Sequence, residues 1–344
     1  MEKMRAAVIT KVGTCEIREY DRPVPAANEV LIQNKACALC TWETRVFYGI
    51  KQMKMPYVEG HEVSGVVVAK GAEVSDEWAI GEKVIVRKFW SCGHCYFCRK
   101  GFGTQCITPD PNAEKYEANG GFCEYMVVPA SDLFKCSQDI PFEKSALAEP
   151  ISCVIHSIDK GRIDLGDDVL VIGAGIMGML HIQLAKLRGA RVIVSEIDEN
   201  RRKLALEMGA DVAFSPLEHD SEEYVKSLTE GRGADVVFNT ASSVAVSELT
   251  PKLVAATGRI VAYSSQHPDD PAGIRFGDLH NREYELVGSV SPSVWDFQRA
   301  AKLISMNALK LDPLIEAIYP FEQAQQAFDA AKPGTFRIVL RIGE

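Results

Sequence analysis

The sequence predicts an α/β protein with two domains, a β-rich domain and a doubly wound parallel-sheet domain. Its 344 residues suffice for about two domains. Short β-type segments, separated by Gly and Pro, run from residue 5 to about residue 150. Beyond residue 168, apolar strands alternate with segments of helical period, a pattern typical of a parallel sheet.

In the N-terminal half, alternating and β-branched residues predict four strands, at 6–9, 29–34, 63–69 and 83–86. Gly65 and Gly71 lie close to the apolar run 66–68 and predict tight turning of the chain there. This half is therefore expected to be partly barrel-like.

In the second half, the run 169–172 is apolar throughout, as expected for a strand buried on both faces. Further strands are expected at 191–195, 234–239 and 259–262, and helices at 175–187 and 201–208, the latter ending at Gly209. After about residue 289 the alternation loosens. Helices are expected at 295–306 and 322–331, and a closing strand at 336–342.

The first turn of the parallel-sheet domain matches the dinucleotide-binding pattern G-x-G-x-x-G. Its residues are Gly173, Ala174, Gly175, Ile176, Met177 and Gly178. The turn follows a predicted strand and opens a predicted helix, which is the context that gives the pattern its meaning. Gly173 permits the tight turn, Gly175 allows a pyrophosphate to approach, and Gly178 allows close helix packing. The helix N-terminus would face the phosphates.

The next predicted strand ends at Glu196, which follows Gly178 by 18 residues. A carboxylate there accepts hydrogen bonds from ribose hydroxyls and repels the 2′-phosphate of NADP, so NAD is the expected cofactor. Arg201 and Arg202 follow and could pair with that phosphate. NADP therefore stays open as an alternative.

Four cysteines, Cys92, Cys95, Cys98 and Cys106, have the spacing C-x2-C-x2-C-x7-C. Zinc binds four thiolates in a tetrahedron, and a closed set of four leaves no position for a substrate. The spacing therefore predicts a structural zinc site. An iron–sulfur cluster is the main competing interpretation.

These motifs occur together with Cys37-Ala-Leu-Cys40, Gly60-His61-Glu62 and Ala148-Glu149-Pro150. In this order they resemble the zinc-dependent medium-chain dehydrogenases of the alcohol dehydrogenase superfamily, close to the sorbitol and threonine dehydrogenase branch. The resemblance covers nearly the whole chain. It implies a GroES-like catalytic domain at 1–150, a Rossmann NAD-binding domain at 151–288, and a return to the catalytic domain at 289–344.

The resemblance also implies a second, catalytic zinc held by Cys40, His61 and a carboxylate, either Glu62 or Glu149. Such a metal acts as a Lewis acid on the alcohol oxygen, and the alcohol carbon gives its hydride to NAD. Two zinc ions per chain, one catalytic and one structural, are therefore expected. Cys40, His61, Glu62 and Glu149 are the expected catalytic residues.

The sequence departs from the family at the substrate site. The Ser or Thr that normally hydrogen-bonds the bound alcohol is Trp42 here, so Glu149 is hypothesised to take the proton. The Arg-Tyr pair of sorbitol-type enzymes is also missing. Trp42, Arg45 and Tyr48 are expected to line the cleft instead; aromatic rings suit a sugar face, and Arg45 could meet an anion.

The function that follows is reversible, NAD-linked oxidation of a secondary alcohol on a polyol, sugar or sugar derivative. The alternative within the enzyme class is an L-threonine 3-dehydrogenase-like enzyme acting on a hydroxy-amino acid or another anionic hydroxy compound. A zinc-free quinone reductase relative and a non-enzymatic nucleotide-binding relative remain as other classes.

The amino-acid composition indicates which classes of binding partner and which cellular location are expected. The net charge of −9 disfavours nucleic acid and anionic membranes. No apolar run approaches the roughly 20 residues of a membrane span, and the chain shows no signal-peptide pattern at its start. The expected protein is cytoplasmic, acts on a small-molecule alcohol or polyol, and, by resemblance, forms a homodimer or homotetramer.

Overall fold

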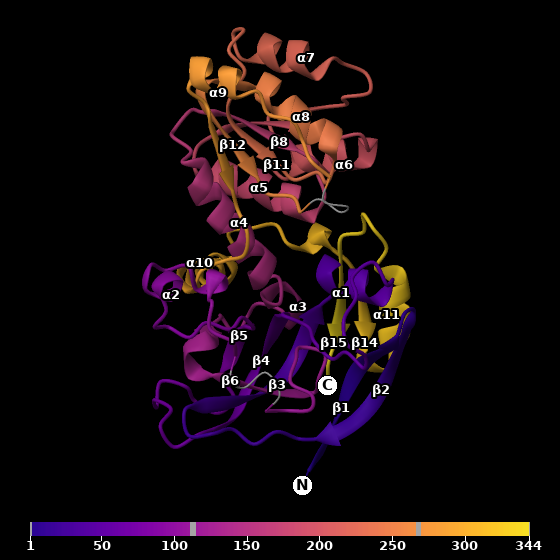
Figure 1. Cartoon of the computed structure of the whole chain (residues 1–344). Helices are drawn as coiled ribbons and strands as arrows, with labels where there is room; N and C mark the ends of the chain where they lie inside the picture. Colours follow the sequence, from indigo (N-terminus) through magenta and orange to yellow (C-terminus); the bar gives the residue numbers. More distant parts are fainter. Residues whose placement is uncertain (1, 111–114, 266–269, 344) are drawn as a thin grey trace. The chain divides into compact units, whose positions relative to one another are not determined.

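The computed structural model describes residues 2–110, 115–265 and 270–343. It divides into two compact units (Figure 1). Unit 1 comprises residues 1–152 and 292–344, and unit 2 comprises residues 153–291. The chain therefore leaves the first unit, builds the second, and returns to the first.

Unit 1 is built on a seven-stranded sheet with the order β14-β15-β3-β4-β5-β7, in which β6 also pairs with β3. All its pairs are antiparallel except β14–β15. The strands are β3 (Glu29–Ala38), β4 (Glu62–Lys70), β5 (Lys83–Arg87), β6 (Tyr125–Pro129), β7 (Leu133–Lys135), β14 (Ile315–Pro320) and β15 (Arg337–Arg341). A separate antiparallel hairpin consists of β1 (Lys3–Lys11) and β2 (Thr14–Asp21).

Short helices connect these strands. They are α1 (Thr41–Phe47), α2 (Tyr96–Arg99), α3 (Phe142–Ser145), α10 (Val294–Ser305) and α11 (Ala324–Ala330), with 3-10 turns η1 (Gly103–Gln105), η2 (Ala130–Asp132), η3 (Asp312–Leu314) and η4 (Phe321–Gln323). Helix α4 (Ala148–Gly161) runs from the end of the first stretch of unit 1 into unit 2.

The core of unit 1 packs α1 against α11. The buried ring of Phe47 stacks on Phe328 at 5.1 Å between centroids, and Phe122 meets Phe328 edge-on at 5.5 Å. Helix α1 follows Cys40 directly and ends at Phe47, so this aromatic packing anchors the C-terminal end of the helix that carries Cys40 at its N-cap.

Unit 2 is a six-stranded, fully parallel sheet with the order β10-β9-β8-β11-β12-β13. The strands are β8 (Asp168–Ile172), β9 (Arg191–Ser195), β10 (Val212–Phe214), β11 (Ala234–Asn239), β12 (Val254–Ala262) and β13 (Glu285–Gly288). The helices are α5 (Ile176–Leu187), α6 (Glu199–Glu207), α7 (Ser221–Leu228), α8 (Val244–Leu253) and α9 (Phe276–Arg282). The strand order reverses beside β8, where doubly wound folds bind ligands. The predicted doubly wound parallel sheet is confirmed.

The structure differs from the sequence-based expectation mainly at element ends. Helix α6 begins at Glu199 rather than at residue 201, because the Asp198 side chain accepts a hydrogen bond from the Arg201 backbone N–H and caps the helix earlier. The helix expected at 322–331 opens with the 3-10 turn η4, and α11 starts at Ala324. Strands β2, β6, β7, β10, β13 and β14 were not predicted; β10, with three residues, is too short to show a clear period.

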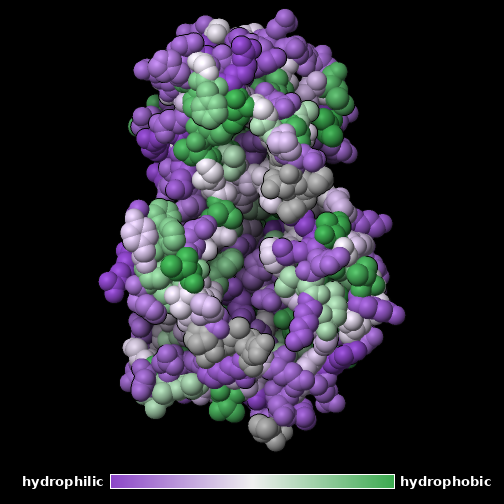
Figure 2. Space-filling view, viewed as in Figure 1, coloured by the Kyte–Doolittle hydropathy of each residue, from purple (hydrophilic) through white to green (hydrophobic). Residues whose placement is uncertain are grey.

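The surface is mostly hydrophilic in the view of Figure 2, with smaller hydrophobic patches on each unit. No helix within the described ranges has both the length and the apolar composition needed to span a bilayer.

Candidate functional site

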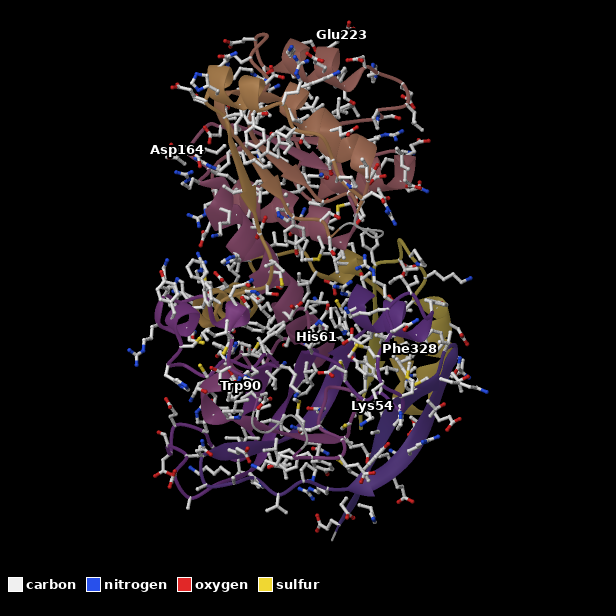
Figure 3. The ribbon with its side chains drawn as sticks, in the orientation of Figure 1. Lys54, His61, Trp90, Asp164, Glu223 and Phe328 are labelled. Atoms are coloured by element: carbon white, nitrogen blue, oxygen red, sulfur yellow. The ribbon has the colours of Figure 1, made fainter. Side chains whose placement is uncertain are left out.

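Cys40, His61 and Glu62 form a cluster in unit 1, with one ligand atom from each lying within 4.8 Å of the others. Cys40 stands at the N-cap of α1, and Glu62 opens β4 opposite Ala38 of β3. Gly60 precedes them with φ of +101°, and a Cβ there would lie 2.9 Å from the Cys37 sulfur. Figure 3 shows His61 among the side chains of this unit.

The His61 ring is oriented by Glu43, a fully buried residue of α1. The Glu43 carboxylate lies 2.7 Å from Nδ1 of His61. Burial disfavours the imidazolium, but Glu43 and then Cys40 outweigh burial and raise the pKa of His61 well above its ordinary value. With Nδ1 engaged, Nε2 is the nitrogen left for a metal, which is the arrangement of histidine ligands backed by a carboxylate.

Glu62 is held by Arg337 of β15. The guanidinium donates to both carboxylate oxygens of Glu62, at 2.8 and 2.6 Å, and lies 3.8 Å from the Cys40 sulfur. Burial opposes the charge of Arg337, but Glu62 and Cys40 outweigh it and raise the pKa of the guanidinium. The cluster thus contains a buried bidentate ion pair with a thiol beside it.

Glu149 is not among the clustered ligand atoms found in the described residues. It lies in the first turn of α4, is buried, and is close enough to Arg337 for its charge to act on that guanidinium. Of the four residues predicted to meet at the catalytic metal, the structure brings together Cys40, His61 and Glu62.

The four cysteines predicted to bind the structural zinc also lie together, in a segment (residues 92–106) called here the four-cysteine lobe. The sulfurs of Cys92, Cys95, Cys98 and Cys106 lie within 4.8 Å of one another. Backbone N–H groups support them, since Cys95 N donates to the Cys92 sulfur at 3.3 Å and Cys92 N to the Cys106 sulfur at 3.4 Å. Hydrogen bonding, led by Thr108, lowers the pKa of Cys92 to about 5. The donor set fits a closed tetrathiolate zinc site.

The glycine turn in unit 2 has the geometry that the pattern predicts. Gly173 adopts φ of +92°, and a Cβ on Gly178 would lie 1.9 Å from the Gly173 carbonyl oxygen. Gly175 has open space around the position of a Cβ. Ile176 and Met177 then begin α5, and their backbone N–H groups belong to the helix N-terminus that can receive an anion.

Glu196 is tied to this turn. Its carboxylate accepts hydrogen bonds from the backbone N–H of Ala174 at 2.6 Å and of Asp198 at 2.9 Å. Arg202 is engaged elsewhere, because its guanidinium donates to the carbonyl oxygens of Glu196 and Ile197 at 2.9 and 2.7 Å. This engagement weakens the case for Arg202 as a phosphate ligand.

The three residues predicted to line a substrate cleft, Trp42, Arg45 and Tyr48, all belong to α1 or its C-cap. The Trp42 indole is half-exposed and donates from Nε1 to the Tyr57 hydroxyl at 3.0 Å. The Tyr48 hydroxyl donates instead to carbonyl oxygens of Phe328 and Asp329 at the end of α11, so it serves the packing of unit 1.

A cavity of about 450 Å³ lies beside this site within unit 1. Tyr57, Glu59 and Phe89 are among its lining residues, and the Phe89 ring centroid lies 6.0 Å from that of His61. Burial raises the pKa of the Tyr57 hydroxyl, which therefore remains protonated at neutral pH.

Several residues of the site were missed by the sequence analysis. Glu43 had a detectable signal, since it follows Cys40 by three residues at the place of the family's aspartate. Arg337 and Tyr57 had none, because nothing near them in the sequence connects them to Cys40 or Trp42.

Comparison with protein families gives two matches. Residues 26–138 match the alcohol dehydrogenase GroES-like domain, and residues 177–306 match the zinc-binding dehydrogenase family. Among curated proteins, L-threonine 3-dehydrogenase of Pyrococcus horikoshii is 33% identical and covers 99% of both chains. Erythritol/L-threitol dehydrogenase of Mycolicibacterium smegmatis is 29% identical, over 97% of this chain and 95% of the relative.

Solved structures of similar fold are also dehydrogenases. A zinc-binding dehydrogenase of Sinorhizobium meliloti bound to NADP superposes with a TM-score of 0.90 at 28% identity, covering 99% of this chain and 100% of that one. An alcohol dehydrogenase from Escherichia coli CFT073 in complex with NADH gives a TM-score of 0.89 at 26% identity, with the same coverage.

Proposed function

The chain belongs to the zinc-binding alcohol dehydrogenase family, and from this premise we propose that its substrate is a secondary alcohol on a polyol, a sugar or a sugar derivative. It is an oxidoreductase, and zinc and NAD are its cofactors. The observation that supports the reaction best is the donor set of Cys40, His61 and Glu62 within 4.8 Å, with His61 backed by Glu43.

The residues present fit a catalytic zinc. A thiol, an imidazole with one free nitrogen and a carboxylate are ligand types that zinc accepts, and three protein ligands leave a position for the substrate. Bound there, zinc supplies Lewis acidity that makes the alkoxide accessible near neutral pH. Glu43 keeps the His61 ring oriented, and Arg337 keeps the Glu62 carboxylate oriented.

We propose that the alcohol proton leaves through a carboxylate, because Trp42 has no hydroxyl to relay it. Glu149 is the candidate, since it is buried in the first turn of α4 and its charge acts on Arg337, the partner of Glu62. The pH–rate profile of Glu149→Gln tests this assignment. An unchanged profile would overturn it.

The four-cysteine lobe is proposed to hold the second, structural zinc. Its supporting observation is the close grouping of four thiol sulfurs, a closed ligand set that leaves no open position on zinc.

In unit 2, the residues proposed to bind NAD are the turn 173–178, Glu196 and Arg201. The carboxylate of Glu196 favours NAD over NADP. Faster turnover with NADP than with NAD would contradict this role of Glu196.

A hydroxy-amino acid is the second candidate substrate. The similarity to L-threonine 3-dehydrogenase of Pyrococcus horikoshii supports this candidate, with 33% identity over nearly the whole chain.

We further propose that the protein is cytoplasmic and forms a homodimer or homotetramer. Size-exclusion chromatography with light scattering would test the assembly.

The decisive experiment is a substrate screen. Polyols, sugars, sugar phosphates, hydroxy acids and threonine are offered with NAD, and NADH is read by absorbance, alongside metal analysis of the purified protein. Two zinc ions per chain and NADH formation with at least one alcohol are expected. Cys40→Ala should abolish turnover but leave NAD binding intact; normal turnover in that variant would refute the catalytic assignment.

A further inference from the structure

Two basic residues, Arg45 and Lys51, are close to Trp42 in the sequence, and the side chain of Lys51 lies over the Trp42 ring. Neither forms an ion pair with a residue in the described part of the chain. The Lys51 ammonium lies 3.7 Å from the Trp42 ring centroid, and the Lys51 backbone N–H donates to the Arg45 carbonyl oxygen at 3.0 Å. The chain has 47 acidic against 38 basic residues, so an acidic partner is generally at hand. The position of Lys51 over an indole, with no ion pair to any described residue, therefore needs an explanation.

The ammonium of Lys51 is held rather than free. An indole face attracts a cation through its quadrupole, which gives Lys51 a preferred position. Trp42 is itself fixed, since its Nε1 donates to the hydroxyl of buried Tyr57 at 3.0 Å. Tyr57 in turn lines a cavity together with Phe89, whose ring centroid lies 6.0 Å from that of His61.

This arrangement also lies close to the metal ligands. Trp42 is two residues beyond Cys40, in the first turn of α1. The acidic side chain of α1, Glu43, is fully buried and committed to His61, and the Glu59 carboxyl near Tyr57 has its pKa raised by burial. The positive charge of Lys51 is thus available to a group that arrives from solution beside the cluster.

We propose that Lys51, seated on Trp42, binds an anionic oxygen group of the substrate, so that the natural substrate is a secondary alcohol carrying a carboxylate or a phosphate. A lysine ammonium is a point charge suited to both groups. Trp42 acts as a positioning residue for Lys51. This inference rests on the proposed function and narrows its substrate class, because a neutral polyol gains nothing from an ammonium.

The test uses matched alcohols with the full-length zinc enzyme and NAD. Sorbitol, gluconate and sorbitol 6-phosphate form one set, and erythritol, erythronate and erythritol 4-phosphate form another. An anionic member should exceed its neutral parent in kcat/KM by about tenfold or more, as expected for a charge-assisted hydrogen bond. The carboxylate and phosphate arms show which of the two groups is preferred.

Variants assign the effect to Lys51. Lys51→Met should lower kcat/KM for the anionic substrate about tenfold, mainly through KM, and lower it much less for the neutral parent, so that the preference for the anionic substrate is lost. Lys51→Arg should restore most of the loss. Trp42→Leu should raise KM for the anionic substrate because it removes the aromatic ring over which the Lys51 ammonium lies. Trp42→Phe keeps an aromatic face and should raise this KM less. Lys54→Met is the matched control, since Lys54, labelled in Figure 3, is exposed and close in sequence, whereas Lys51 is the lysine that lies over the Trp42 ring.

A second measurement does not depend on turnover. Acetylation of Lys51 by an N-hydroxysuccinimide ester, read by peptide mass spectrometry, should be slowed by sorbitol 6-phosphate or gluconate and not by sorbitol. Lys54 should be labelled equally in all three cases.

The outcomes separate the two proposals. If no member of either set reduces NAD and the wider screen also fails, the proposed function is wrong. If only neutral members react, or if Lys51→Met and Lys54→Met behave alike, the oxidoreductase stands and the role of Lys51 is overturned.

Discussion

Four charged or ionisable side chains lie almost completely buried around Cys40, and each depends on another. Glu43 pairs with His61, and Glu62 pairs with Arg337. A charge in a low-dielectric interior is costly unless it is paired and hydrogen-bonded. Each pair therefore fixes a ligand while removing the cost of burying it.

Removal of one partner should reveal that cost. In the zinc-free protein, Arg337→Met would leave the Glu62 carboxylate buried with no cation, which is expected to reduce the free energy of unfolding by about 3–5 kcal/mol. Urea unfolding followed by circular dichroism measures it. The double variant Glu62→Gln/Arg337→Met should recover much of the loss, because no unpaired charge remains. A single variant as stable as the parent would contradict the buried pair.

Glu43 offers a sharper test of ligand orientation. Glu43→Gln keeps the side-chain size but removes the charge beside Nδ1 of His61. Zinc affinity at this site, or turnover, should fall by about 10–100-fold. Titration with a chelator followed by metal analysis measures the affinity. Glu73→Gln, at an exposed position of the same unit, should change neither quantity.

At the scale of elements, the turn between β8 and α5 shows how packing and binding can be separated. A Cβ on Gly178 would meet the Gly173 carbonyl oxygen at 1.9 Å, whereas a Cβ on Gly175 would meet nothing within 4 Å. Gly178 is therefore required by the packing of the fold itself, whereas Gly175 leaves space that a ligand can occupy.

The paired variants test this separation. Gly178→Ala should destabilise unit 2 by about 1–3 kcal/mol through overpacking and also weaken NADH binding. Gly175→Ala should fold with unchanged stability yet bind NADH more weakly, because its methyl group would occupy the approach of the pyrophosphate. Thermal unfolding and calorimetric titration with NADH give the two quantities. Equal stability losses in both variants would contradict the assignment.

At the scale of the whole molecule, the four-cysteine lobe stands apart from the hydrophobic cores. Helix α2 and turn η1 contain no buried residue, so apolar packing does little to hold this segment. Backbone support of the sulfurs and the proposed metal must supply the order instead.

Loss of one lobe ligand should therefore act locally. Cys98→Ala is expected to release one of the two zinc ions, to expose residues 92–107 to proteolysis, and to lower the melting temperature by about 4–8 °C, corresponding to roughly 2 kcal/mol. Metal analysis, limited proteolysis and calorimetry measure these effects. Retention of both zinc ions would show that Cys98 is not a ligand.

The predictable parts of this protein are those whose signal is local. The parallel sheet of unit 2 follows from apolar runs and helical periods, and strands β9 and β11 begin and end where the pattern predicts. The starts of α6 and α11 were predicted less accurately, because capping and 3-10 geometry depend on single side chains.

The same distinction holds at the site. The cysteine spacing 92–106 and the glycine turn 173–178 lie within short stretches, and a metal or a phosphate constrains such a stretch directly, so the amino-acid sequence alone determined them. The partners of the catalytic cluster were decided by tertiary structure. Arg337 is 275 residues from Glu62 and meets it only because β15 joins the sheet beside β3 and β4. Lys51 reaches Trp42 only through the turn after α1. Contacts of this kind leave no period or spacing in a sequence, because the pairing of buried charge is a property of the folded interior.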